Sequence, residues 1–133
     1  MKALNVFLKI LIVCLFTFSC SNSDDKQIEE VKLEEVTANV IFWEYTADTG
    51  NNTSRLRYVI EFQNPNDIAV NGYYRIKQNA DGLITTAFST NKSPCYQIGA
   101  NSTCTLSFDA EDSHDLGKLN SIDLISVEYI IEV

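Results

Sequence analysis

Apolar side chains recur at every second position through much of the chain, and this spacing restricts what the chain can form. The pattern is clearest in three segments, at residues 55–63, 103–109 and 125–132. Because successive side chains of a strand point to opposite faces, each segment is predicted to be a half-buried strand. The residues expected to face inward are Leu56, Tyr58, Ile60 and Phe62, then Cys104, Leu106 and Phe108, then Ile125, Val127, Tyr129 and Ile131.

Turn-forming segments separate these strands from further ones predicted at residues 36–45, 73–77 and 83–88. The separating segments are rich in Asn, Asp, Gly and Pro, the residues that favour turns. They lie at residues 48–52, 64–67, 79–82 and 99–101. Short strands with frequent turns predict an all-β domain, a single antiparallel sandwich of six to seven strands over residues 36–133.

The N-terminal segment, residues 1–19, is basic, then apolar, then small, as in an export signal. Its apolar run of about nine residues is shorter than the roughly 20 that span a bilayer. The order resembles a bacterial lipoprotein signal, in which the cysteine after the leader is lipidated and becomes the mature N-terminus. Ser19 and Cys20 match that pattern, whereas Thr17 stands where the strict form has an aliphatic residue. The alternatives are a plain secretory signal cut beside Cys20 and an uncleaved anchor, which Lys9 disfavours.

Cys20 is therefore the predicted lipidation site, and residues 20–35 are a predicted acidic, flexible tether. A diacylglyceryl group, with a third chain such as palmitate on the amine, would hold the protein firmly, because each buried methylene contributes about 0.8 kcal/mol. Residues 21–25, Ser-Asn-Ser-Asp-Asp, resemble the export signal of Bacteroidetes lipoproteins. The resemblance implies an outer-membrane anchor at the cell surface. The alternative is a periplasm-facing anchor, with the acidic run only keeping the tether soluble.

Two cysteines, Cys95 and Cys104, remain once Cys14 leaves with the leader and Cys20 carries lipid. An even pair in an exported protein predicts a disulfide. The turn at residues 99–101 is expected to place the pair on the two strands of one hairpin, a geometry compatible with a disulfide. The alternative, a metal site, lacks further ligands at zinc spacing.

The mature chain is strongly acidic. It keeps eight basic against 18 acidic residues, a formal charge of −10, because Lys2 and Lys9 lie in the leader. Such a charge repels phosphate backbones, so no nucleic-acid partner is expected.

Three further segments carry a resemblance to known domains. They are Glu-Phe-Gln-Asn-Pro-Asn at residues 61–66, Gly-Tyr-Tyr-Arg-Ile at residues 72–76, and the stretch at residues 95–108 that contains both cysteines. Together they resemble small immunoglobulin-like or fibronectin-like domains, and in style the sandwich of late-embryogenesis-abundant and similar bacterial exported domains, where Asn-Pro-Asn follows a strand. The likeness covers residues 36–133 and implies an immunoglobulin-like β-sandwich. It implies no catalytic residue, since such families share no catalytic site.

Few residues offer catalytic or metal-binding chemistry. The one histidine, His114, lies in an acidic run at residues 109–115, and with Ser113 and Asp115 it cannot form a triad, because adjacent side chains point in different directions. Nucleophile-elbow, phosphate-loop and His-Glu-x-x-His motifs are missing from the sequence. The run is predicted to be a solvated loop between the last two strands. The alternative is a calcium site, without EF-hand spacing, that uses the carboxylates of Asp109, Glu111, Asp112 and Asp115.

Aromatic residues supply one candidate binding patch. Trp43 and Tyr45 alternate with Phe42, so one of the two sets must face outward or across an edge. Exposed aromatic side chains are enriched in binding surfaces. Trp43 and Tyr45 are therefore candidate ligand-binding residues, with the sandwich core as the alternative place for them.

Taken together, these features predict a non-enzymatic, lipid-anchored module of the cell envelope that serves interaction or accessory roles. Its expected partners are the membrane, through the lipid, and an envelope protein; no cofactor is expected. The alternative function is that of a small ligand-binding lipoprotein that captures a glycan or calcium.

Overall fold

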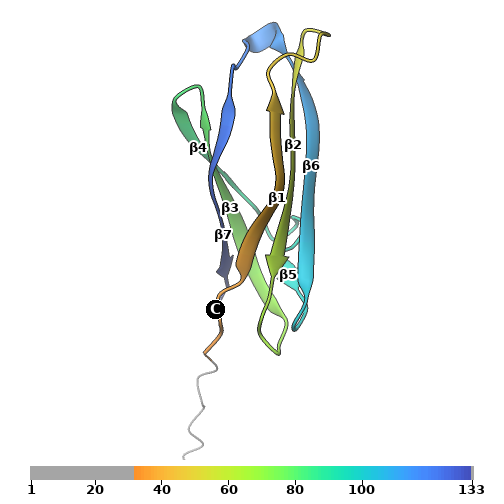
Figure 1. Ribbon diagram of the computed structural model, residues 1–133. Helices are drawn as coiled ribbons and strands as arrows, with labels where there is room; N and C mark the ends of the chain where they lie inside the picture. The colour runs from red at the N-terminus through yellow and green to blue at the C-terminus, as the bar shows by residue number, and fades with distance from the viewer. Residues whose placement is uncertain (1–31, 133) are drawn as a thin grey trace, which may run out of the picture. The chain divides into compact units, whose positions relative to one another are not determined.

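The computed structural model describes residues 32–132, which form two facing antiparallel sheets (Figure 1). One sheet has the strand order β1-β2-β6, and the other has β3 between β7 on one side and β4 and β5 on the other. The predicted all-β sandwich is confirmed, with seven strands. The elements are β1 (Thr37–Thr46), β2 (Thr53–Gln63), β3 (Val70–Ala80), β4 (Leu83–Phe88), β5 (Gln97–Ile98), β6 (Thr103–Ser113), the 3-10 turn η1 (His114–Leu116) and β7 (Ile122–Ile131).

The predicted leader, Cys20 and most of the predicted tether lie outside the described residues. Within residues 32–132, no helix is both long and apolar enough to cross a bilayer.

In the β1-β2-β6 sheet, the alternation of β2 sets the register. Phe62 lies opposite Ala38 of β1 and Cys104 of β6, and Ile60 lies opposite Leu106, so one face of the sheet is apolar. Phe62 and Ile60 are fully buried. The register of β1 shifts between Val40 and Phe42. This bulge lets the strand present Val40 and then Trp43 on its inner face, with Phe42 on the outer face.

In the second sheet, β3 directs Tyr74 and Ile76 inward and Tyr73 outward, as two adjacent tyrosines of a strand must lie. Gly72 faces the ring of Tyr129 on β7. A Cβ atom at residue 72 would lie 2.5 Å from that ring and 2.4 Å from the carbonyl oxygen of Ile130. The glycine is therefore required by the close approach of the two strands.

The core lies between the inner faces, toward the end of the domain where β1 begins and β7 ends. Phe62 packs against Tyr74 and Tyr129, with ring centroids 5.4 and 5.5 Å apart. Toward the other end the packing continues as a stack of Trp43, Tyr58 and Phe108, one from each strand of the first sheet. The buried apolar residues are Val36, Ile60, Phe62, Val70, Ile76, Cys95, Ile98, Leu106 and Tyr129.

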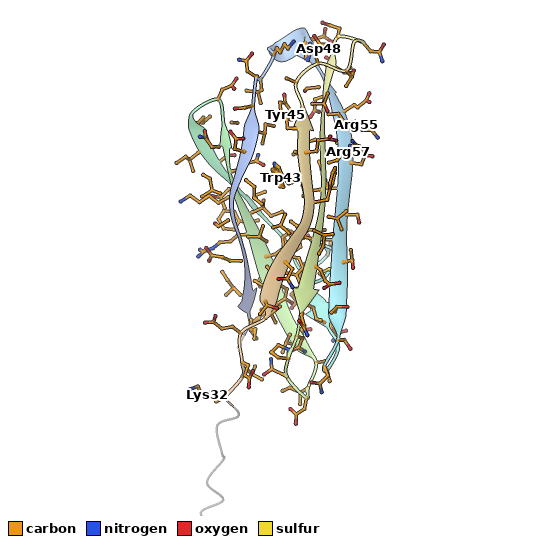
Figure 2. The ribbon with its side chains drawn as sticks, viewed as in Figure 1. Lys32, Trp43, Tyr45, Asp48, Arg55 and Arg57 are labelled. Atoms are coloured by element: carbon orange, nitrogen blue, oxygen red, sulfur yellow. A yellow bond between two sulfur atoms is a disulfide. The ribbon has the colours of Figure 1, made fainter. Side chains whose placement is uncertain are left out.

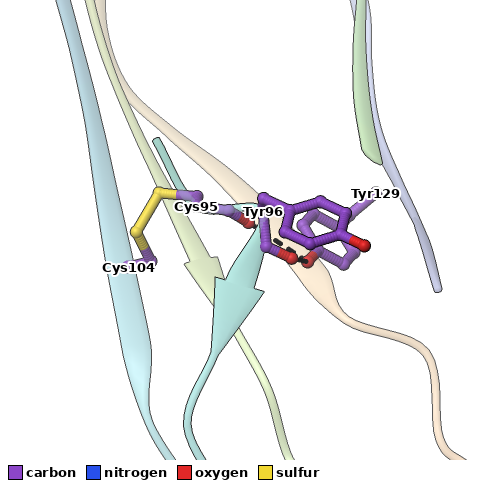
Figure 3. Close-up of a disulfide and its surroundings, with 4 residues drawn as sticks. All are labelled: Cys95, Tyr96, Cys104 and Tyr129. Carbon is purple, nitrogen blue, oxygen red and sulfur yellow. Dashed lines mark hydrogen bonds between the residues drawn. A yellow bond between two sulfur atoms is a disulfide. The ribbon is translucent and has the colours of Figure 1, made fainter. Parts of the chain in front are cut away.

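The Cys95–Cys104 disulfide is confirmed, but the predicted hairpin between the two cysteines is wrong. Cys95 precedes β5, which pairs with β3, whereas Cys104 lies on the inner face of β6 in the other sheet. The disulfide therefore joins the two sheets, with 5.6 Å between the Cα atoms (Figure 3). The turn at residues 99–101 connects one sheet to the other, because β5 before it pairs with β3 whereas β6 after it pairs with β2. β5 is only two residues long.

Two other predictions about strand geometry are corrected. The acidic segment at residues 109–113 is not a loop, since β6 continues through it to Ser113 and pairs with β2 throughout.

Ile125 does not share the inner face with Val127 and Tyr129. The register between β3 and β7 shifts at this point, and Ile125 is 47 % exposed while Leu124 packs on the core.

A buried asparagine pair orders the end of the domain at which the chain enters. Asn64 is fully buried, and its amide nitrogen donates to the carbonyl oxygens of Ile68 and Gly99 at 2.9 and 2.8 Å. Its oxygen accepts from the backbone and side-chain nitrogens of Asn66. Asn66 in turn exchanges two hydrogen bonds with the backbone of Glu34, at 2.7 and 2.9 Å. The contacts of the domain therefore begin before the predicted boundary at residue 36.

Candidate functional site

The candidate ligand residues Trp43 and Tyr45 lie between β1 and β7 (Figure 2). The indole nitrogen of Trp43 donates to the carbonyl oxygen of Ile122 at 3.0 Å. The hydroxyl of Tyr45 donates to the carbonyl oxygen of Leu119 at 3.1 Å. The Trp43 ring also stacks on Tyr58. Trp43 thus joins the edge strands β1 and β7, and Tyr45 joins β1 to the segment before β7. Ligand binding by the two residues stays a prediction.

The four calcium-candidate carboxylates are not brought together. Asp109 binds the guanidinium of Arg55 through both oxygens at 2.7 Å, and this contact holds the pKa of the Asp109 carboxyl below its usual range. Glu111 lies 3.9 Å from the same guanidinium. Asp112 is on the opposite face of β6, and Asp115 is in η1. Among the described residues, no group of three or more His, Cys, Asp or Glu side chains is placed to hold a metal ion.

The Ser113–His114–Asp115 segment makes local hydrogen bonds only. The Ser113 hydroxyl donates to the Asp115 carboxylate at 2.7 Å and accepts from the Asp115 backbone nitrogen, which caps η1. The Nε2 atom of His114 is buried and has no hydrogen-bond partner within residues 32–132. Serine, histidine and carboxylate are therefore not linked in the order that a nucleophilic triad requires.

A groove of about 550 Å³ runs between the entering chain and β7. Leu33, Val36 and Ala38 line one side, and Val127 and Ile131 line the other. All five of these side chains also belong to the core or pack against it. The groove is therefore continuous with the core at the end where the chain enters the domain.

The outer face of the β4-β3-β7 sheet is the most distinctive open surface. Here we call it the Phe88 face. Pairing across the three strands aligns its residues in rows, with Phe88 opposite Arg75 and Arg75 opposite Glu128. Phe88 is 71 % exposed, and Ile84 and Ile130 are also exposed. The residues of the face are Tyr73, Arg75, Lys77 and Asn79 from β3, Ile84, Thr86 and Phe88 from β4, and Asp123, Ser126, Glu128 and Ile130 from β7.

A pocket of about 230 Å³ lies at the centre of the Phe88 face, and here we call it the Arg75–Lys77 pocket. The Nε atom of Arg75 donates to the Glu128 carboxylate at 2.9 Å, and a second nitrogen of the guanidinium contacts the same oxygen. Lys77 makes no ion pair with any described residue. The lining residues are Arg75, Lys77, Thr86, Phe88, Ser126 and Glu128.

The rim of the Phe88 face is fixed by a pair of tyrosines. The ring centroids of Tyr73 and Tyr96 are 5.4 Å apart, and the Tyr96 hydroxyl donates to the Glu132 carboxylate at 2.5 Å. This hydrogen bond to a carboxylate raises the pKa of Tyr96 to about 12. The Tyr96 hydroxyl therefore remains a donor to Glu132 into the strongly alkaline range.

The outer face of the other sheet differs in composition. Its arginines are taken up by acidic neighbours: Arg55 pairs with Asp109, and Arg57 pairs with Glu44 while lying 5.6 Å from the centroid of the Phe42 ring. Exposed ion pairs of this kind contribute little to stability and leave few groups free for a ligand. Of the two outer sheet faces in residues 32–132, the Phe88 face is the one on which a cation without an ion pair and an exposed aromatic ring occur together.

Sequence reasoning did not find the Phe88 face. Alternation along a strand shows which residues share a face with Phe88 in β4 and with Arg75 in β3. It does not show which face of β4 is covered, because apolar residues lie on both of its faces, with Leu83 and Ile84 adjacent. Register between strands, which no local motif encodes here, is what aligns Phe88, Arg75 and Glu128.

Comparison with known proteins adds no relative. The chain matches no protein-family model, and no curated protein or solved structure is significantly similar to it. The resemblance to Bacteroidetes lipoproteins and to immunoglobulin-like domains therefore stays a prediction from the sequence.

Proposed function

We propose that this protein is a non-enzymatic, lipid-anchored module of the cell envelope that binds its partner through the Phe88 face. The observation that carries the proposal is the 71 % exposed ring of Phe88 beside Arg75 and Lys77 on an ordered sheet. Three strands hold these side chains in fixed rows. Exposed aromatic and arginine side chains on a rigid surface are the residues that contribute most to binding.

The predicted anchor suits this surface. Cys20 precedes Lys32 by twelve residues, a span of at most about 40 Å when fully extended. The chain then enters the domain at the end ordered by Asn64 and Asn66. A domain held at that end leaves the outer faces of its sheets, the Phe88 face among them, open to molecules beside it. The outer membrane and the cell surface remain the proposed location.

The proposal is tested by purifying the native protein in mild detergent and identifying what accompanies it by mass spectrometry. A stoichiometric companion, protein or glycan, that is lost in Phe88→Ala and kept in Phe42→Ala is the expected result. Phe42 is a matched control because it is an exposed aromatic on the outer face of the other sheet. A companion that both variants retain would place the binding surface elsewhere.

A further inference from the structure

We propose that the Arg75–Lys77 pocket binds a sugar ring that carries a single negative charge, such as a uronic acid residue of an envelope or extracellular glycan. This inference rests on the proposed function, because it names the chemistry that the Phe88 face recognises. Three features of the pocket favour this ligand: the backbone below it, the charge within it and the shape of its groups.

The backbone below the pocket is fully occupied. β3 forms the floor, and the segment Arg75–Ala80 is hydrogen-bonded to β4 on one side and to β7 on the other. An extended peptide recognises a sheet by adding a strand to a free edge, where main-chain groups are unpaired. No such edge exists at β3, so a ligand of this pocket is held by side chains alone. This favours a compact ring over an extended peptide.

The charge of the pocket points to an anion. Glu128 already compensates Arg75, whereas Lys77 two residues further along the same face has no acidic partner among the described residues. The chain as a whole is acidic, with a formal charge of −8. Because this net charge repels anions, the free ammonium of Lys77, and not the charge of the whole chain, is the group that would hold one negative charge here. The neighbouring Glu128 carboxylate disfavours a group with two.

The remaining groups suit a sugar. Phe88 offers an exposed, flat, apolar surface on one side of the pocket, and a sugar ring has an apolar face of C–H groups. Around it stand the hydroxyls of Thr86 and Ser126 and the carboxylate of Glu128, which can donate to or accept from ring hydroxyls. The volume of about 230 Å³ suits one ring rather than a long ligand.

Isothermal titration of the mature, full-length protein with trigalacturonate and with neutral galactotriose of the same linkage tests this proposal. The protein is kept in a detergent without a sugar head group. We expect trigalacturonate to bind about tenfold or more tightly than the neutral sugar, because a charge-assisted hydrogen bond to Lys77 is lost with the carboxylate. Lys77→Gln and Phe88→Ala should each weaken binding by about tenfold, whereas Lys92→Gln and Phe42→Ala should leave it unchanged.

Several results would overturn the proposal. They are no binding of either sugar at millimolar concentration, equal binding of both sugars, or binding that Lys77→Gln does not weaken. A glutamate pentapeptide that binds with the same dependence on Lys77 and Phe88 would replace the sugar with an acidic peptide. If no sugar binds but a protein companion still requires Phe88, the ligand class is wrong and the proposed function stands.

Discussion

Single side chains tie separate segments of the domain together at defined points. Tyr129 is the clearest case, because its one hydroxyl proton is shared between the carbonyl oxygens of Cys95 and Tyr96, with oxygen–oxygen distances of 3.1 and 2.9 Å (Figure 3). These two carbonyls lie beside the disulfide, so the hydrogen bonds and the covalent bond fix the same loop. Trp43 does the equivalent at the edge between β1 and β7, through the carbonyl oxygen of Ile122.

Tyr129→Phe should lower the free energy of unfolding by about 1–1.5 kcal/mol, because it removes one hydroxyl that satisfies two carbonyls and keeps the ring packed. Urea unfolding measures this loss as a lower midpoint, with the slope of the free energy against urea concentration the same as in the wild type. Tyr45→Phe is the control, since its hydrogen bond to Leu119 is exposed and should matter less. Equal losses in the two variants would contradict the role given to Tyr129.

The same residue predicts a loss of stability at alkaline pH. Burial raises the pKa of Tyr129 from 10.0 to about 12. Between these values the unfolded chain has released the proton and the folded chain still holds it, so stability falls as pH rises from 10 toward 12. The contribution is fully present below pH 10. The free energy of unfolding, measured across this pH range, should fall less steeply in Tyr129→Phe than in the wild type. The fall that remains in the variant is expected from Tyr96.

At the scale of elements, the disulfide compensates for the shortness of β5. A two-residue strand adds little pairing, yet it carries Ile98 into the core and connects the sheets. The Cys95–Cys104 bond holds the segment before β5 against β6. The asparagine pair Asn64 and Asn66 has a similar role, since it joins the turn after β2 to the entering chain and to Gly99.

Reducing the disulfide, or replacing both cysteines with serine, should destabilise the domain by about 2–3 kcal/mol in the chain-entropy model of a ten-residue loop. For a domain of this size this corresponds to a drop in Tm of on the order of 10–20 °C. Thermal unfolding with and without reductant measures it. The double-serine variant should be insensitive to reductant, and a wild type that melts equally in both conditions would contradict this expectation.

Asn66→Ala should release the entering chain without unfolding the sandwich. Its side chain holds both backbone groups of Glu34, so amide hydrogen exchange at Glu34 should become faster by about tenfold or more. Exchange at Ile60, in the fully buried part of β2, should change much less. Asn39→Ala on the exposed face of β1 is the control. Unchanged protection at Glu34 would mean that other contacts hold the chain there.

The sequence predicted the elements better than their connections. The alternation in β2 predicted its inner face, since Tyr58, Ile60 and Phe62 form a strict two-residue repeat. The same rule failed at Ile125, because a register shift between β3 and β7 moves that side chain out of the repeat. The hairpin expected between the cysteines failed because a turn signal does not say which strand the next segment will pair with. Asn64 resembles any turn asparagine, and its burial depends on carbonyls more than 30 residues away.

At the scale of the whole molecule, the proposed arrangement is a lipid at Cys20, a segment of eleven residues (21–31) before Lys32, and a sandwich that binds through the Phe88 face. Cys20→Ala should move the protein from the membrane to the soluble fraction, since the acyl chains supply its membrane affinity. Cell fractionation and the mass of the N-terminal peptide measure this. A Cys20→Ala variant that stays in the membrane fraction would show that another part of the chain is the anchor.

The most direct test of the central claim is site-specific photocrosslinking on intact cells. A photoreactive residue replaces Thr86, in the middle of the Phe88 face, or Thr105, an exposed residue on the outer face of β6 in the other sheet. If the Phe88 face is the binding surface, a discrete crosslinked product forms from residue 86 and not from residue 105. Crosslinking from residue 105 alone, or equally from both positions, would contradict the account.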